Sequence, residues 1–194
     1  MRRLALRGVL VAVGSTCITP IPALAQDLSC VVMNEEEHPL DERASPLDSL
    51  SIDIGFFTVK VCYGRPSAAG RTMIGLFVPY GQVWQVGANE PTMIHTTGDI
   101  TIAGIRVPAG SYSLYAVPGE GQWEIIVNRS TTQWGESGYS EDLRVQEVGR
   151  APVPAERGPR YVDRLTFRTR PASHGYVFLM LEWERVQVMI PIGP

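Results

Sequence analysis

The sequence of 194 residues lacks any stretch of ten or more residues in which apolar side chains recur with the period of a helix. A parallel sheet needs crossover connections that are usually helices, so this absence excludes α/β folds as well as helical bundles. Beyond the N-terminal leader, no apolar run is long enough to span a membrane as a helix. The sequence therefore predicts an all-β fold with little or no helix and no membrane span.

Residues that build catalytic and metal centres are also scarce. The chain has three histidines and three cysteines, and none of them occurs in an H-x-H, H-E-x-x-H or C-x-x-C spacing. No G-x-S-x-G motif is present, and no glycine-rich phosphate loop opens a helix. We therefore expect no metal site and no cofactor, and catalysis is the least favoured class of function.

Long hydrophobic runs are confined to the N-terminus. Three arginines lie among the first seven residues, residues 10–21 are mostly apolar, and residues 23–25 read Ala-Leu-Ala. These features are typical of a secretory signal peptide. Two prolines interrupt the apolar run, which is shorter than the roughly 20 residues that a transmembrane helix needs. We expect residues 1–25 to be removed on export, which predicts a periplasmic or extracellular protein.

Basic residues are not in excess. After the leader, 14 basic and 20 acidic residues leave a net charge of −6, and eight acids lie between Asp27 and Asp53 with Arg43 as the one basic residue there. Because this stretch has little apolar periodicity, residues 26–50 are expected to form an acidic, loosely ordered arm. Arginines cluster in residues 150–170, where we expect part strand and part proline-rich linker. A chain without a basic excess is not expected to bind nucleic acid.

Two cysteines, Cys30 and Cys62, remain after the leader. An even pair in an exported chain favours a disulfide, which would join the arm to the first strands across a loop of about 30 residues. Cys62 alternates with the apolar set of residues 57–63 and so points to the opposite face of that strand. This favours the bridge over the alternative, a pair of free buried thiols.

From Ser51 to the C-terminus, short segments with period-two hydrophobicity alternate with glycine and proline turns. This pattern predicts one domain, residues 51–194, folded as a single antiparallel β-sandwich of jelly-roll type with about nine to eleven short strands. Residues 176–183 and 186–192 are expected to form a terminal hairpin. The expected strands are 51–54, 57–63, 92–97, 100–103, 105–107, 111–117, 123–127, 143–148, 161–168, 176–183 and 186–192.

The period-two pattern is interrupted by a long loop, residues 64–91, which we call the motif loop. It is rich in glycine and carries two arginines whose planar guanidinium groups suit a carboxylate, phosphate or sulfate. We expect Arg65, Arg71, Asn89 and Glu90 to converge, with at least one of these arginines paired to Glu90. The candidate ligand-binding residues in and beside this loop are Arg65, Arg71, Trp84, Asn89, Glu90 and His95.

Beyond Leu50 the chain contains, in this order, the runs R-P-S-A-A-G-R-T-M-I-G, V-P-Y-G-Q-V-W-Q-V-G-A-N-E, V-P-A-G-S-Y-S-L-Y-A-V-P-G, W-E-I-I-V-N and L-E-W-E-R-V-Q-V-M-I-P-I. This ordered set resembles a bacterial exported family that is catalogued as a domain of unknown function, number 2911. The resemblance implies an exported, mainly β domain and supplies no activity. The family usually has an arginine directly after the motif tryptophan, whereas this chain has Gln85, which weakens an anion-binding role there.

Three functions are compatible with these observations. The first is a noncatalytic envelope module that binds a small polar or anionic ligand or a glycan at the motif loop, where Tyr80, Trp84 and Trp134 line a groove or belong to the core. The second is a structural or assembly protein in which the motif is an internal polar network. The third is a hydrolase that uses Glu90 or His95.

Overall fold

The computed structural model describes residues 28–135 and 138–194, and the expected signal peptide lies outside them. The described chain forms nine strands that follow one another in the order β1-β2-β3-β6-β7-β8-β9-β4-β5. All pairings between these strands are antiparallel. The strands are β1 (Leu47–Ile54), β2 (Phe57–Gly64), β3 (Met93–Thr96), β4 (Ile100–Ile102), β5 (Ile105–Val107), β6 (Gly110–Val117), β7 (Gln122–Asn128), β8 (Glu147–Pro171) and β9 (Val177–Gly193).

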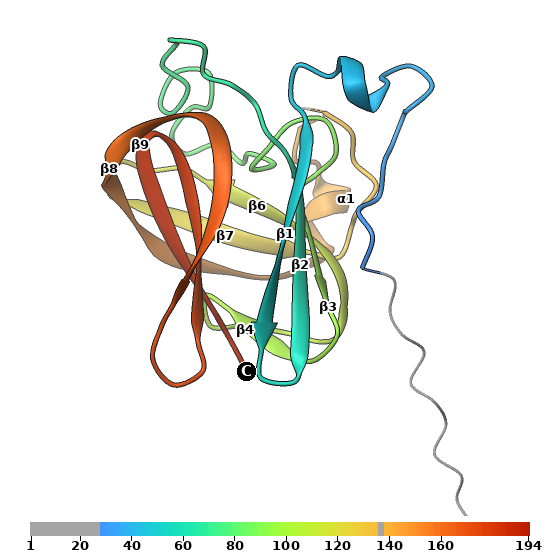
Figure 1. Ribbon diagram of the computed structural model, residues 1–194, viewed down its shortest axis with the longest axis vertical. Coiled ribbons are helices and arrows are strands. Elements are labelled where there is room, and N and C mark those ends of the chain that lie inside the picture. The colour runs from blue at the N-terminus through green and yellow to red at the C-terminus, as the bar shows by residue number, and fades with distance from the viewer. Residues whose placement is uncertain (1–27, 136–137) are drawn as a thin grey trace, which may run out of the picture.

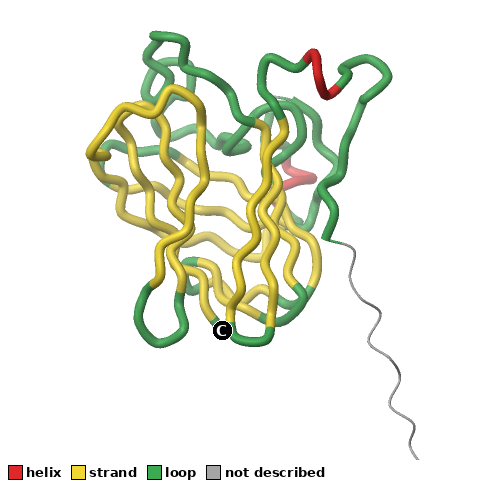
Figure 2. The backbone as a smooth tube through the Cα atoms, viewed as in Figure 1, coloured by secondary structure: helices red, strands yellow, loops and turns green. Residues whose placement is uncertain are grey.

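This architecture confirms the predicted all-β sandwich (Figure 1). The helical elements of the described chain are the 3-10 turn η1 (Leu40–Glu42) and the four-residue helix α1 (Glu141–Arg144). The motif loop connects β2 to β3 and lies at the upper end of the molecule (Figure 2), which is also where η1 lies. The expected long connection at residues 64–91 is therefore present, and it covers one end of the sandwich.

The 25-residue strand β8 joins the two layers of the sandwich. Its first part pairs with β7 as far as Pro154, and its second part pairs with β9 from Ala155 onward. The expected proline-rich linker is thus a strand, and Pro152 and Pro154 are compatible with one because they lie on an unpaired edge. Ala155 donates its N–H toward the β7 side, to Gly121 O. Pro152 and Pro154 alternate with it and so face the free edge, where a missing N–H breaks no ladder.

The expected terminal hairpin is wrong. Residues 177–183 and 186–192 lie in one continuous strand, β9, which bends at Glu184 with a φ of 52°. The sequence at this point, Glu184-Arg185, has no glycine or asparagine to form a tight turn, so the strand bends instead of reversing. The actual hairpin joins β8 to β9 through residues 172–176.

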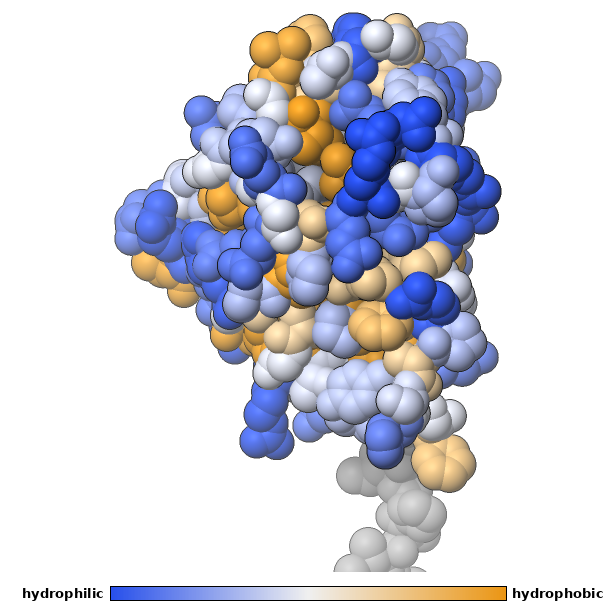
Figure 3. Space-filling view, turned by 90° about the vertical axis from the view of Figure 1, so that its left-hand side faces the viewer, coloured by the Kyte–Doolittle hydropathy of each residue, from blue (hydrophilic) through white to orange (hydrophobic). Residues whose placement is uncertain are grey.

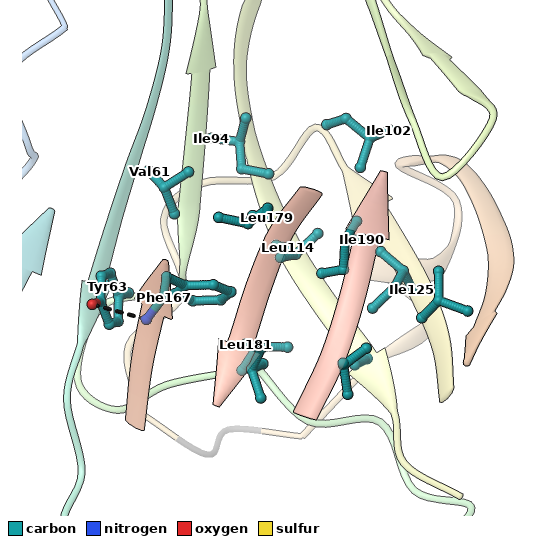
Figure 4. Packing of buried hydrophobic residues seen from close by; sticks show 14 of the residues in the cluster. Val61, Tyr63, Ile94, Ile102, Leu114, Ile125, Phe167, Leu179, Leu181 and Ile190 are labelled. Carbon is teal, nitrogen blue, oxygen red and sulfur yellow. Dashed lines mark hydrogen bonds between the residues drawn. The ribbon is translucent and has the colours of Figure 1, made fainter. Parts of the chain in front are cut away.

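The core lies between the two layers. Figure 4 shows side chains from β2, β3, β6 and β7 facing side chains from β4, β8 and β9. Tyr63 lies within this core, and its hydroxyl accepts a hydrogen bond of 3.1 Å from the backbone N–H of Phe167. The labelled residues are Val61, Tyr63, Ile94, Ile102, Leu114, Ile125, Phe167, Leu179, Leu181 and Ile190.

The acidic segment ahead of β1 runs beside the sheet (Figure 1) and is joined to it covalently. Cys30 and Cys62 form a disulfide with a Cα–Cα distance of 5.6 Å, so the predicted bridge is present. Glu35, Glu36 and Glu37 are exposed, as expected for an acidic and solvated stretch.

The bridge predicts a measurable loss of stability when it is removed. Because it closes a long loop in the unfolded chain, the double variant Cys30→Ser/Cys62→Ser should lose about 2–4 kcal/mol of unfolding free energy in urea titrations. The unreduced parent without residues 1–25 should show no free thiol on quantitative labelling in denaturant. Labelling of both cysteines would contradict the bridge.

Candidate functional site

The central contact of the candidate site is a buried ion pair between Glu90 and Arg43. Arg43 Nη1 lies 2.8 Å from Glu90 Oε1 and 3.0 Å from Oε2. The two side chains are 3% and 2% exposed. Met33 N donates a further hydrogen bond of 2.9 Å to Oε1, and Arg43 Nη2 donates one of 2.8 Å to Met33 O. The partner of Glu90 is therefore an arginine of the acidic segment, and not Arg65 or Arg71.

Asn89 extends this contact to two further segments. Its Nδ2 donates a hydrogen bond of 3.0 Å to Ser45 O, and its backbone O accepts one of 2.8 Å from Gly135 N. Beside them, the Arg43 guanidinium lies 5.2 Å from the centroid of Trp134, on which His38 also stacks. The end of the motif loop, the segment before β1 and the segment after β7 therefore meet at Asn89 and Glu90.

The two motif arginines stabilise the start of the loop. Arg65 donates from Nε to Leu165 O at 3.1 Å and from Nη2 to the Thr166 hydroxyl at 2.8 Å, and its Nη1 lies 3.2 Å from Asp48. Arg71 donates to the backbone oxygens of Ala68 and Ser67. No ion pair or hydrogen bond within the described residues joins either arginine to Glu90, so the four predicted side chains do not form one cluster.

His95 and Trp84 occupy different environments. His95 lies on β3, is 4% exposed, and has its Nδ1 2.7 Å from the Ser111 hydroxyl of the neighbouring strand β6. Trp84 is 7% exposed and stacks on Trp183 with ring centroids 5.6 Å apart. The Trp84 ring also makes an edge-to-face contact with Trp123, with ring centroids 6.1 Å apart. Of the six candidates, Trp84 is the one that also lines a cavity.

The motif loop is held close to the sheet by an unusual backbone. A Cβ atom added to Gly64 would lie 2.0 Å from Ala88 O, so only glycine allows the two backbones to approach here. Val86 has a φ of 58°, which is costly for a β-branched residue. Such conformations persist only where surrounding contacts fix them, and the contacts of Asn89 and Glu90 lie immediately after this turn.

A cavity of about 320 Å³ lies between the middle of the motif loop and the segment that follows β7. Its walls combine apolar and aromatic side chains with three glutamines and two phenols. None of the described side chains that line it is charged. The lining residues are Phe77, Val78, Pro79, Gln82, Val83, Trp84, Gln85, Tyr115, Gln133, Gly135, Gly138 and Tyr139.

Gln85 is the most informative of these residues. It is 6% exposed, it lines the cavity, and its side-chain amide has no hydrogen-bond partner among the described residues. Tyr115 and Gln133 by contrast bond to each other, with the phenol donating to Oε1 at 2.9 Å. The Gln85 Oε1 and Nε2 atoms are not among the fully buried polar atoms that lack a partner, so they are accessible from outside the protein interior. The Gln85 amide is therefore available to a ligand.

Tyr139 forms another wall of the cavity and is tied to a charged network behind it. Burial raises the pKa of Tyr139 to about 12, and the hydrogen bond from Asn128 opposes this rise. Its hydroxyl donates to Glu147 Oε1 at 3.0 Å. Hydrogen bonds from Arg150 hold the pKa of Glu147 below its usual value. The phenol is thus neutral at physiological pH, and only its ring is offered to the cavity.

Sequence reasoning missed Arg43, Gln85 and the phenols of Tyr115 and Tyr139. A signal existed for Arg43, since it is the single basic residue in a segment with eight acids. Gln85 was noted as a departure from the family pattern, but not as a possible ligand-binding group. No local signal marks the two tyrosines, because they come from β6 and from the loop before α1 and meet only in the folded chain.

The described residues hold no group of three or more histidine, cysteine, aspartate or glutamate side chains arranged for a metal ion. Within the same residues, no helix is long and apolar enough to cross a membrane.

Comparison with known proteins identifies a family but no activity. A family model described as "Protein of unknown function (DUF2911)" matches residues 45–192. No curated protein and no solved structure matches the chain.

The buried pair predicts a large effect of a small change. Glu90→Gln should lower the unfolding free energy by about 3–5 kcal/mol, because it leaves the Arg43 guanidinium buried without a counter-charge. Glu141→Gln is the matched control, since Glu141 pairs with Arg144 while 78% exposed and should cost below about 1 kcal/mol. Urea titrations of the three proteins measure both values. Equal small losses would show that the pair does not hold the loop.

The environment of Tyr139 predicts alkaline sensitivity. Because its pKa is raised to about 12 in the folded protein, the unfolded chain loses this proton first, near its ordinary value of 10. Its contribution to stability is complete below pH 10 and is lost as the pH rises through about 12. The parent should therefore lose unfolding free energy more steeply over this range than Tyr139→Phe does. Parallel slopes of the two proteins would be inconsistent with this environment.

Proposed function

This chain belongs to the DUF2911 family of proteins of unknown function, and we propose that it is a noncatalytic module that binds a small, uncharged polar ligand in the cavity beneath the motif loop. The observation that carries the proposal is the Gln85 amide, which is 6% exposed and unbonded within the described chain at the wall of a cavity of about 320 Å³. The volume lies within the range of roughly 300–1,000 Å³ that small-molecule sites occupy.

The lining supports an uncharged ligand over an anionic one. Arg65 and Arg71, which suggested an anion, donate their hydrogen bonds to the protein's own backbone and hydroxyl oxygens and do not line the cavity. A charged ligand would lose its hydration without gaining a counter-charge from the described lining, which is unfavourable.

The shape of the binding groups narrows the ligand further. The Gln85 amide presents an N–H donor and a carbonyl acceptor side by side. A ligand with a planar group that carries an acceptor next to a donor can bond to both. The rings of Trp84, Tyr115 and Tyr139 provide aromatic surfaces against which a flat ligand can stack. We therefore propose a small, flat molecule that carries an amide-like edge.

A structural role for the motif is the second candidate, and one observation favours it. Arg43 and Glu90 form a bidentate pair that is almost fully buried and joins segments far apart in the sequence. Such a pair fixes the position of a loop whether or not a ligand binds. The two roles are compatible, because the same contacts that hold the loop also position one wall of the cavity.

The hydrolase alternative receives the least support. Glu90 is 1% exposed, with its carboxylate bonded to Arg43 and to the backbone of Met33. His95 is 4% exposed and pairs with Ser111. Neither side chain lines the cavity described above.

An oxidising compartment fits the chain best. The Cys30–Cys62 disulfide is typical of proteins that function outside the cytosol. Together with the leader-like residues 1–25, it supports a periplasmic or extracellular location. Mass determination of the protein recovered from the bacterial envelope or medium would test whether the chain starts at Gln26.

Three isosteric probes test the proposed site: benzamide, benzoate and benzamidinium. Benzamide should bind with a dissociation constant on the order of 1 mM, detected by shifts of amide resonances around the cavity. Benzoate and benzamidinium should bind at least about tenfold more weakly, because the described lining offers no counter-charge. Gln85→Leu should weaken benzamide binding by about tenfold, since it removes the donor and acceptor together.

Gln122→Leu is the matched control for Gln85→Leu, because Gln122 is exposed on β7 and does not line the cavity. It should leave benzamide binding unchanged. The proposal is overturned if none of the three probes binds at a concentration of about 20 mM. Tighter binding of benzoate than of benzamide would instead establish an anion site.

A further inference from the structure

A second cleft, of about 510 Å³, opens on the other side of the motif loop. It lies where the loop meets the turn before β7 and the bend of β8 and β9. Figure 3 shows the face that carries β8 and β9, where hydrophobic residues near the top of the molecule lie among strongly hydrophilic ones. The floor of the cleft includes the buried side chains of Ile74, Trp123 and Ala155. This cleft is not part of the cavity proposed above, because none of the described residues lines both.

The cleft is formed by an irregularity in the sheet. The register between β8 and β9 shifts between Arg157 and Val162, and β9 bends opposite this shift at Glu184. Such bulges bend strands away from each other and redirect side chains, and they often lie next to binding sites. The Glu184 carboxylate turns toward the motif loop, where its Oε2 accepts a hydrogen bond of 2.9 Å from Ile74 N.

The indole of Trp123 is the feature that points to a ligand. Trp123 lines the cleft, is 1% exposed, and its Nε1–H has no hydrogen-bond acceptor within the described part of the chain. The neighbouring Trp183, by comparison, donates its Nε1–H to Asp163 O at 3.0 Å. A buried tryptophan usually finds an acceptor for this group. The Nε1 atom is itself buried, so a ligand reaches this unused donor by displacing side chains at the floor of the cleft.

The rim of the cleft carries unpaired groups of both signs. Glu120, Glu156, Arg157 and Arg185 line it, and none of them takes part in an ion pair or side-chain hydrogen bond within the described residues. With Glu184, which also lines the cleft, three carboxylates and two guanidinium groups surround it, so a ligand of either charge meets repulsion as well as attraction. A hydroxyl group both donates and accepts, so a polyhydroxyl ligand can bond to carboxylates, guanidinium groups and the indole N–H together.

Two exposed aromatic rings complete the arrangement. Tyr80 and Tyr161 line the cleft and are each 45% exposed. The apolar face of a sugar ring can stack on such rings while its hydroxyls reach the polar groups beside them. We propose that this cleft is a saccharide-binding site for a neutral oligosaccharide, with Trp123 Nε1–H donating to a sugar oxygen and Tyr80 and Tyr161 stacking on sugar rings.

Three neutral probes test the proposal: cellotetraose, maltotetraose and N,N′,N″,N‴-tetraacetylchitotetraose. At least one should bind with a dissociation constant on the order of 1 mM or below. The indole N–H resonance of Trp123 should shift on binding. This resonance is assigned as the one that is missing from the spectrum of Trp123→Phe. This variant keeps an aromatic ring but removes the N–H together with the pyrrole part of the indole, and it should weaken saccharide binding roughly fivefold.

Tyr161→Ala should also weaken saccharide binding roughly fivefold, because it removes a stacking surface. Tyr176→Ala is its matched control, since Tyr176 is 36% exposed and lies outside the cleft. Benzamide binding should be unchanged in both variants, which separates this site from the first cavity. The proposal is overturned if none of the three saccharides binds at about 10 mM. Equal binding by the parent and Trp123→Phe would also overturn it.

Discussion

The buried pair between Arg43 and Glu90 fixes the arrangement on which the rest of this site depends. Irregular segments have few backbone bonds of their own, so their relative position must come from side chains. Here one carboxylate receives a guanidinium and a backbone N–H of the N-terminal segment, while adjacent Asn89 holds the segment after β7. Because a buried charge is costly without its partner, the loss of either side chain of the pair would destabilise the contact between these segments.

This arrangement also explains why the described lining of the cavity is uncharged although the motif loop is rich in charge. The charged groups Arg65, Arg71 and Glu90 are used to hold the loop against the sheet and the N-terminal segment. What remains along the middle of the loop is a short run of apolar, aromatic and amide side chains. The charged residues of the motif loop therefore position the loop, and the uncharged residues in its middle form the surface of the cavity.

Much of the fold could be predicted from the sequence, because period-two hydrophobicity and turn residues are local signals. The errors arose where a strand bends instead of ending, at Pro154 and at Glu184, since a sheet edge or a bulge cannot be recognised without knowing the neighbouring strand. Of the candidate site residues, Trp84 lines the cavity, whereas the partner of Glu90 was not predicted. The pair joins positions 47 residues apart, and local patterns carry no information on such distances.

The contacts that close the sandwich have a consequence for how the chain folds. Arg65 and Ser67 bond to residues 163–166, and Tyr63 accepts a bond from Phe167, about one hundred positions later in the sequence. Closing so long a loop is slow, because its entropy must be lost before the contacts form. Until β8 has emerged from a ribosome or a translocation pore, the first strands have no opposite layer. The nascent chain therefore stays open until nearly all of it is available.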